Sequence, residues 1–202
     1  MSDATIDFDA NIFKTINNFA QLRGFYNRYN REAINWYKSQ VSKIQVGRMQ
    51  LLSDNQIYQH SKPGIGHFCF FFYSAKGYQE GTLPYYDTSP MSLILGQEGK
   101  YVDGLNVHYI PLHLRVQLFQ QLLAIEGGSL SDRQKFTASY EAIKAMGNLY
   151  KPCYKRYLLS RIKSQAVWVP IDSSLIATFL PVANFKGASQ AKVYADSRKL
   201  II

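Results

Sequence analysis

The sequence predicts an α+β fold, with an N-terminal helix or helices, a small antiparallel β-sheet or barrel, and C-terminal helices with a late strand. Two patterns indicate it: apolar residues recur at helical spacing near both ends, and short apolar runs alternate with glycine-rich turns between them. The 202 residues are 47% hydrophobic and 14% aromatic, which is enough for a sizeable core. We expect a helical segment at 1–43 and an α+β domain at 44–202, whose sheet covers about 44–110, whose helices cover about 112–165, and whose late strand and tail cover 166–202.

The N-terminal region has the apolar spacing of helices. Its apolar side chains form two adjoining stripes, one of Ile12, Ile16, Phe19, Tyr26, Ala33 and Tyr37, and one of Leu22, Phe25, Tyr29 and Trp36. Asp9 or Asn11 is a suitable N-cap for the first turn. Gly24 weakens the middle of the region, which favours two shorter helices over one long helix.

The central region has the features of strands and turns. "KIQVGRMQLL" (43–52) alternates loosely, whereas "GIGHFCFFFYSA" (64–75) and "MSLILG" (91–96) contain short apolar runs that predict buried strands. The glycine-flanked "GQEGKYVDG" (96–104) predicts a turn between strands. In "GLNVHYI", Leu105, Val107 and Tyr109 alternate with Asn106 and His108, which predicts one further, half-buried strand.

Helical signals return after Pro111. "PLHLRVQLFQQLLAIEGG" (111–128) has proline near its start and two glycines after its end, and its expected buried face is Leu114, Leu118, Leu122 and Ile125. Ser131 is a suitable cap for a helix in "SDRQKFTASYEAIKAMGNL".

The last third of the chain continues this mixture. "KPCYKRYLLSRIKSQ" (151–165) predicts another helix with Pro152 in its first turn. "AVWVPI" (166–171) predicts the late strand, and "DSSLIATFLP" predicts a short helix capped by Asp172. The tail, "ANFKGASQAKVYADSRKLII", is expected to be irregular with a basic end.

The sequence lacks the signatures of common enzymes and metal sites. It contains no G-x-S-x-G, C-x-x-C or H-E-x-x-H pattern, and "GIG" (64–66) is not followed by the residues of a phosphate loop. The spacings His67-x-Cys69 and His108-x4-His113 favour ordinary hydrogen-bonded histidines over metal ligands. We therefore predict no enzyme, no metal and no cofactor.

Two acids and two thiols remain as candidates. Asp87 and Asp103 flank the "MSLIL" strand, where a carboxylate pair would suit a metal-dependent nuclease. Each also lies beside turn-forming residues, so we predict structural turn residues that bind their own backbone. Cys69 and Cys153 are expected to be inert buried thiols in a reducing compartment.

The basic residues are better organised. The formal net charge of +9 and the pI of about 9.5 indicate an acidic partner, such as nucleic acid or an acidic protein surface. One cluster follows the N-terminal helices and contains Arg23, Arg28, Arg31, Lys38, Lys43 and Arg48. The second contains Lys144, Lys151, Lys155, Arg156, Arg161 and Lys163, with tyrosines between them.

The second cluster suits a nucleic-acid backbone if its segment is helical. Lys151, Lys155 and Lys163 then lie close in angle and can neutralise phosphates, while the tyrosines stack on bases or pack inward. The alternative is a solvated basic face with the aromatic residues in the core. The start, "MSDATIDFDANIF", lacks the features of a targeting segment, and the apolar runs are too short to span a membrane, so no membrane partner is expected.

Three segments carry a resemblance to a known family. "LPYYDTSP" (83–90), "GLNVHYIPLHLR" (104–115) and the block from Phe179 to Ser197 resemble, in this order, a family of virion proteins from large contractile-tailed phages of the T-even type. The resemblance covers about Gly47 to the C-terminus. The sequence departs from the family pattern in its short polar turn at 96–104 and in its long aromatic N-terminal region, and the family supplies no catalytic residues.

The resemblance implies a function as a DNA-end protector or head-completion protein, with double-stranded DNA and other virion subunits as partners. Such a protein lies in the virion at the head–neck region, after assembly in the host cytoplasm, and shields the end of the packaged genome from host exonuclease. The alternative is a tail, neck or baseplate connector that binds acidic neighbouring subunits without contacting DNA.

Overall fold

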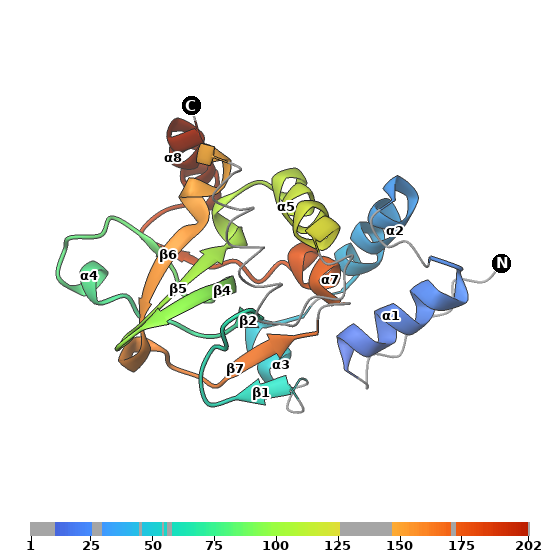
Figure 1. The fold of residues 1–202 in the computed structure, drawn as a ribbon, viewed down its shortest axis with the longest axis horizontal. Coiled ribbons are helices and arrows are strands. Elements are labelled where there is room, and N and C mark those ends of the chain that lie inside the picture. The colour runs from blue at the N-terminus through green and yellow to red at the C-terminus, as the bar shows by residue number, and fades with distance from the viewer. Residues whose placement is uncertain are drawn as a thin grey trace.

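A computed structural model confirms the α+β class. It describes residues 11–25, 30–44, 46–53, 55, 58–125, 147–170 and 173–201. Its main sheet is antiparallel, with six strands in the order β1-β7-β2-β4-β5-β6, and β3 and β8 form a second, two-stranded sheet. Helices lie over the sheet and at both ends of the molecule's long axis (Figure 1).

The described elements have the following bounds. The strands are β1 Gln59–His60, β2 Phe68–Phe70, β3 Tyr86–Asp87, β4 Met91–Glu98, β5 Tyr101–Asn106, β6 Tyr154–Leu158, β7 Ala166–Val169 and β8 Phe185–Lys186. The α-helices are α1 Ile12–Leu22, α2 Arg31–Ser42, α3 Arg48–Ser53, α4 Lys76–Gln79, α5 Leu112–Ile125, α7 Ser174–Phe179 and α8 Gln190–Ile201. Short 3-10 helices are η2 Val107–Tyr109, η3 Gly147–Cys153 and η4 Leu159–Arg161.

The predicted central strands form the middle of the main sheet. β2 pairs with β4 on one side and with β7 on the other, and all three of its residues are buried. β4 and β5 form a hairpin at Gly99, whose φ of 54° lies in the left-handed region that favours glycine. The strands predicted at 64–75, 91–96 and 166–171 are therefore confirmed, as is the turn between β4 and β5.

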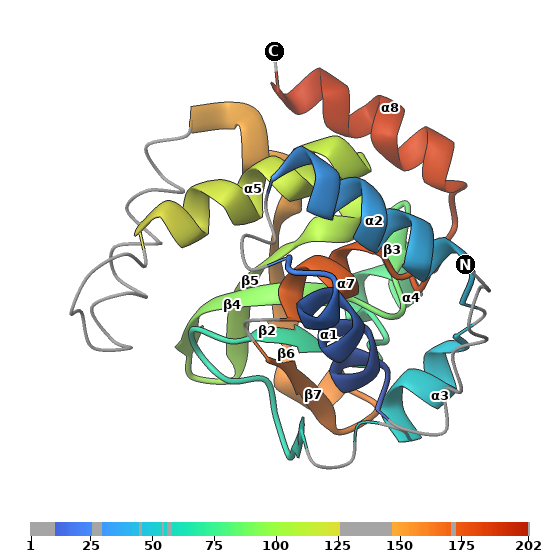
Figure 2. The same ribbon diagram turned by 90° about the vertical axis from the view of Figure 1, so that its right-hand side faces the viewer.

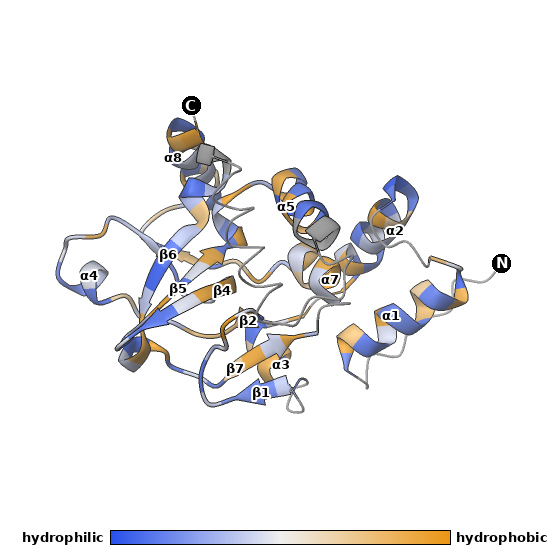
Figure 3. Ribbon diagram, in the orientation of Figure 1, coloured by the Kyte–Doolittle hydropathy of each residue, from blue (hydrophilic) through white to orange (hydrophobic). Residues whose placement is uncertain are grey.

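The core lies between the sheet and a layer of helices. α7 contacts α1, α2 and α5, and its buried side chains Leu175 and Ile176 join a cluster that extends from Ile12 to Val193. In Figure 2, α7 lies between the N-terminal helices and the strands. Figure 3 shows α1 with hydrophobic and hydrophilic residues in separate stripes, whereas β6 is mostly hydrophilic. Among the described helices, none is both long and apolar enough to cross a membrane.

The predicted division of the N-terminal helices is confirmed. The Asn11 side chain accepts hydrogen bonds from the backbone N–H groups of Phe13 and Lys14, which caps α1. Gly24 has a φ of 76°, which no continuing helix allows, and its N–H bonds the Gln21 carbonyl. A new helix then begins at Arg31, capped by the Asn30 side chain.

The helix predicted at 151–165 is wrong. Pro152 lies at the end of η3, and the chain then continues as β6, which pairs antiparallel with β5 from Tyr101↔Leu158 to Leu105↔Tyr154. β5 without β6 would leave a row of N–H and C=O groups unpaired, so long-range pairing overrides the helix-like spacing of the lysines. The predicted row of Lys151, Lys155 and Lys163 on one helix does not exist.

Three smaller expectations also fail. In the loosely alternating run at 43–52, the residues from Arg48 onward form helix α3 instead of a strand. β5 ends at Asn106 and η2 follows, and both Asn106 and His108 are fully buried instead of facing solvent. The C-terminal tail is regular where it was expected to be irregular, since Gln190–Ile201 form helix α8.

Other expectations fall partly or wholly outside the described residues. Asp9, the segment at 126–146 with its predicted cap Ser131, and Asp172 all lie there. In the described part, the helix expected after Pro111 is confirmed as α5, and the short helix after Asp172 is confirmed as α7 with Ser173 at its N-cap.

Two strand glycines provide a test of this packing. A Cβ on Gly104 would lie 2.6 Å from Ser92 Oγ and 2.9 Å from the Leu93 carbonyl oxygen, whereas a Cβ on Gly96 meets nothing within 4 Å. We expect Gly104→Ala to lower the free energy of unfolding by about 1–3 kcal/mol through overpacking. The matched control Gly96→Ala should stay within about 0.5 kcal/mol of the wild type. Urea unfolding measures both, and equal effects would contradict the register of β4 and β5.

Candidate nucleic-acid interface

A buried carboxylate, Asp87, lies at the junction of several segments. Its Oδ1 accepts hydrogen bonds from the backbone N–H groups of Ser89 at 3.0 Å and Asn184 at 3.2 Å. Its Oδ2 accepts one from Asn106 Nδ2 at 3.0 Å and lies 2.6 Å from His108 Nδ1. Asp87 is only 2% exposed, so these four donors replace the water that a carboxylate otherwise binds.

The pair of Asp87 and His108 consists of an ionised carboxylate and a neutral imidazole at pH 7. Burial raises the pKa of Asp87, but His108 and the other hydrogen-bond donors outweigh it and hold this pKa below its ordinary value. Burial lowers the pKa of His108, which Asp87 only partly offsets. His108 Nε2 is buried with no partner among the described residues, so a proton there would be unsatisfied. Nδ1–H therefore donates to Asp87.

The segments around Asp87 are joined by further hydrogen bonds. Ser89 Oγ donates to the Val182 carbonyl at 2.7 Å, and the Thr88 N–H donates to the Asn184 carbonyl at 2.8 Å. β3 also pairs with β8 in this place. The turn after β3 and the chain before β8 thus form one rigid unit with the end of β5.

A cavity of about 360 Å³ opens beside this unit. Asp87 and Asn106 contribute to its lining, and its other walls come from the chain around α4, from β5 and from β6. Its aromatic lining consists of tyrosines: Tyr73, Tyr85, Tyr86, Tyr101, Tyr109 and Tyr157. A concave site with aromatic walls and few charged groups is typical of small-molecule and nucleotide sites.

Lys155 is the half-buried cation in this cavity. Its Nζ lies 3.9 Å from the ring centroid of Tyr109, a distance suited to a cation–π interaction. Within the described ranges, no carboxylate oxygen lies within the 4.0 Å limit of an ion pair with this Nζ. Burial lowers the pKa of Lys155 accordingly. The cavity thus contains a cation that a carboxylate does not neutralise.

Arg156, the next residue, is already neutralised. It makes a bidentate contact with Asp103, with both N···O distances 2.8 Å, and a third contact with Glu98 at 3.1 Å. The hydrogen bonds from Arg156 lower the pKa of Asp103. Asp103 therefore lies in β5 and binds the side chain opposite it, and the prediction of a turn residue bonded to its own backbone is wrong.

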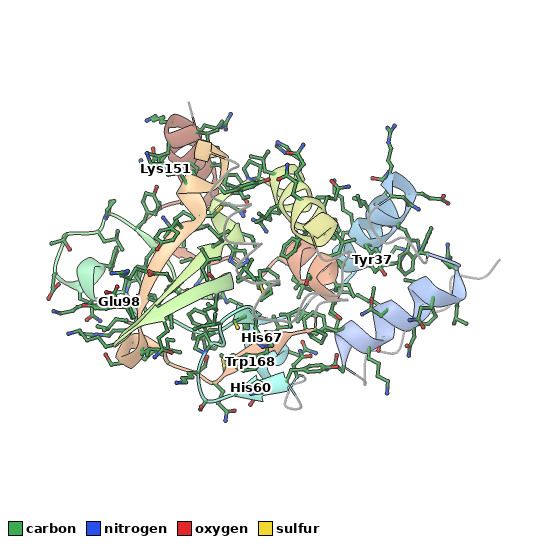
Figure 4. All side chains as sticks on the ribbon, viewed as in Figure 1. Tyr37, His60, His67, Glu98, Lys151 and Trp168 are labelled. Carbon is green, nitrogen blue, oxygen red and sulfur yellow. The ribbon has the colours of Figure 1, made fainter. Side chains whose placement is uncertain are left out.

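The other members of the second basic cluster are dispersed. Lys151 is exposed in η3, beside α8, as Figure 4 shows. Arg161 donates to Gln79 Oε1 at 2.8 Å, and the exposed Lys163 follows η4 at the other end of β6. Lys144 lies outside the described residues.

Several cations near the cavity were missed by the sequence analysis. Lys76 lines the cavity and pairs with Glu80 at 3.1 Å, and Lys186 Nζ lies 5.4 Å from the ring centroid of Tyr78. α8 adds the exposed Lys192 and Lys199. The many tyrosines of 73–109 indicate an aromatic site from sequence alone. Nothing in the local sequence indicates that strand β6 brings Lys155 to that site.

The first basic cluster lies elsewhere. Arg31 and Lys38 are exposed on α2, and the guanidinium of Arg23 lies 5.9 Å from the ring centroid of Trp36. α1 and α2 lie at the opposite end of the long axis from α4 and the β4–β5 hairpin (Figure 1). Arg28 lies outside the described residues. Among the described residues, the first cluster therefore belongs to the N-terminal helices and the second to η3, β6, η4 and the residues after it.

The histidines near β1 take part in aromatic stacking. The ring of Trp168 stacks on His60 at 3.6 Å and on His67 at 4.0 Å between centroids, and Figure 4 shows the three side chains side by side. Among the described residues, no group of three or more metal-ligating side chains comes together. Cys69 and Cys153 are buried free thiols whose pKa values burial raises to about 12.

A comparison with protein families yields a match. The family model described as "Phage T4 terminal DNA protecting protein" matches residues 14–201 of the chain. The searches of curated proteins and of solved structures found no match.

Asp87→Ala tests whether the network around this carboxylate stabilises the fold. The substitution leaves four buried donors without an acceptor, so we expect it to lower the free energy of unfolding by about 3–5 kcal/mol at pH 7. Asp103→Ala is the matched control, because its partner Arg156 is half-exposed and the loss should stay within about 1 kcal/mol. Urea unfolding of the two variants measures the difference, and similar losses would contradict the assignment.

His108 should make stability depend on pH. The unfolded imidazole binds a proton near pH 6.5, but the folded one has a lowered pKa and stays neutral. Stability should therefore fall as the pH falls below about 6.5, by at most about 1.4 kcal/mol per pH unit. His108→Gln should flatten this dependence, and His113→Gln, which removes an exposed histidine, is the control. A wild type that gains stability on acidification from about pH 6.5 to 5 would sink the assignment.

Proposed function

The chain belongs to the family of phage T4 terminal DNA protecting proteins, and from this membership we propose that it binds and shields the ends of the packaged duplex genome. We propose that it does so as a structural component of the virion at the head–neck region, after assembly in the host cytoplasm. The observation that carries the proposal is the tyrosine-lined cavity with its unneutralised Lys155, next to a surface rich in cations.

Physical chemistry supports this assignment. A protein that holds a DNA end regardless of sequence needs cations for the phosphates and flat side chains for the terminal bases. The cavity supplies tyrosines, and other elements supply the exposed cations Lys151 in η3, Lys186 in β8, and Lys192 and Lys199 in α8, where both pair with Asp196. We call these four residues and Lys155 the cavity face.

The chemistry of the acids favours a non-enzymatic role. Asp87 is occupied by four donors, and Asp103 is occupied by Arg156, so neither is available to hold the divalent metal of a nuclease. Protection then follows from occupancy of the end alone, because a bound end is closed to an exonuclease.

A second candidate function concerns the opposite end of the molecule. The first basic cluster on α2 is distant from the cavity, and Leu22 at the end of α1 is 82% exposed. An exposed apolar side chain beside cations suits a contact with an acidic neighbouring subunit of the virion. We propose that this end attaches the protein to the particle. In the alternative function, as a tail, neck or baseplate connector, attachment to neighbouring subunits would be the role of the whole chain.

Binding to linear and circular DNA tests the proposed function. We expect the purified chain to bind blunt linear duplex in preference to closed circular duplex of the same sequence, because only the linear form has ends. The affinity should fall steeply between about 50 and 200 mM salt, because phosphate neutralisation releases counterions. Fluorescence anisotropy with competition measures both. Equal affinity for the two forms, or no binding at about 50 mM salt, would contradict end protection.

Paired substitutions locate the surface that contacts DNA. Lys151→Gln with Lys186→Gln removes two exposed cations of the cavity face, and Arg31→Gln with Lys38→Gln removes two from α2. We expect the first pair to lower the slope of log affinity against log salt by about 2, and the second pair to leave the slope unchanged. The reverse result would place the DNA on α2 and the subunit contact on the cavity face.

A further inference from the structure

The ammonium group of Lys155 is partly buried, although no carboxylate of the described residues pairs with it. Removing an ammonium group from water is unfavourable unless an anion or several acceptors replace the water. Its Nζ lies over the ring of Tyr109, and no carboxylate of the described ranges lies within ion-pair distance of it. The other charged side chain of β6, Arg156, has two carboxylates. Lys155 is thus set apart from its neighbour as a site for an external anion.

The walls around Lys155 indicate which anion. Tyr85 and Tyr109 stack at 6.4 Å between centroids, and the half-exposed Tyr101 also lines the cavity. Tyrosine rings stack on all four bases with little preference, and their hydroxyl groups hydrogen-bond with sugar and base edges. Three of the six lining tyrosines, Tyr73, Tyr85 and Tyr101, are partly exposed and can contact a base. An acidic peptide would use the cation but not these rings.

The cavity is also held in shape before any ligand arrives. Asp87 and Asn106 line it and are locked by the hydrogen bonds of the buried network. Tyr85 is fixed at its outer end, where its hydroxyl donates to Asp196 of α8 at 3.3 Å. A preformed site needs little ordering when it binds, which favours the capture of a single nucleotide.

We propose that this cavity binds the terminal nucleotide of a DNA end, with its phosphate against Lys155 and its base and sugar against the tyrosines. The inference rests on the proposed function and deepens it, because it assigns the terminus itself to one pocket and the adjoining duplex to the exposed cations. The duplex must release its last nucleotide from the stack for this purpose, which costs a few kcal/mol at most and least at a frayed end.

The test uses the full chain and a defined set of probes. A deoxynucleoside 5′-monophosphate, the same deoxynucleoside without phosphate, and inorganic phosphate are titrated while the tyrosine ring signals are followed by two-dimensional NMR. We expect the monophosphate to shift the cavity tyrosines and to bind more tightly than either part alone. Inorganic phosphate that binds as tightly as the monophosphate would overturn the assignment to a nucleotide, as would shifts confined to tyrosines outside the cavity.

Lys155→Met tests the contribution of the positive charge, because methionine keeps an apolar side chain of similar length and removes the charge. We expect it to weaken monophosphate binding by about tenfold to a hundredfold, as the loss of a charge-assisted hydrogen bond does. Lys163→Met is the matched control, since Lys163 is exposed on the same segment but does not line the cavity. Equal affinities in the two variants would overturn the role of Lys155. Urea unfolding confirms that both variants remain folded.

A duplex with one unpaired terminal nucleotide separates this inference from the proposed function. It should compete with the monophosphate for the cavity and bind more tightly than the blunt duplex. If linear duplex binds but never displaces the monophosphate, the end lies elsewhere, so the inference fails while end protection stands. If the monophosphate binds in the cavity but linear and circular duplex bind alike, the cavity is a free-nucleotide site and both proposals fail.

Discussion

The carboxylate of Asp87 is the constraint on which the rest of this structure depends. A buried charge is stable only if hydrogen-bond donors replace its water, and Asp87 has four, from Ser89, Asn106, His108 and Asn184. These donors come from the turn after β3, the end of β5, η2 and the chain before β8. The requirement to satisfy one charge therefore fixes the relative positions of four segments that hydrophobic burial alone would leave free to shift.

The functional surface follows from this arrangement. Once β3, β5 and β8 are locked together, the tyrosines of the chain around α4 and of η2 face β6 across a cavity, and Lys155 reaches Tyr109. The pairing of β6 with β5 gives the two cations of β6 different surroundings. Arg156 binds Asp103 of the neighbouring strand β5, and Lys155 keeps its charge for an external phosphate. The buried network supplies rigidity, and the side chains around it supply affinity.

The sequence predicted the elements whose structure depends on interactions between residues close together in the chain. The apolar runs of β2, β4 and β7 and the caps and glycine of α1 follow from composition and turn chemistry. It could not predict β6, since lysines four and eight residues apart imitate a helix face and only pairing with β5 excludes one. It also placed His108 at the surface by alternation, because the partner that allows its burial, Asp87, is 21 residues away, and Asn184, which completes that network, is 97 residues from Asp87. The family resemblance is carried by three segments, 83–90, 104–115 and 179–197. In the structure, these segments meet at Asp87 and are joined there by hydrogen bonds.

Photocrosslinking tests the central claim most directly, namely that the site built on Asp87 receives the DNA end. A halogenated uracil is placed either at the terminal nucleotide or in the middle of an otherwise identical duplex, and the crosslinked peptides are mapped. The account predicts that the terminal probe attaches to the partly exposed cavity tyrosines Tyr85 and Tyr101, and that the internal probe attaches to the exposed surface around them. Crosslinks from the terminal probe that map to α2, or the same peptides from both probes, would contradict it.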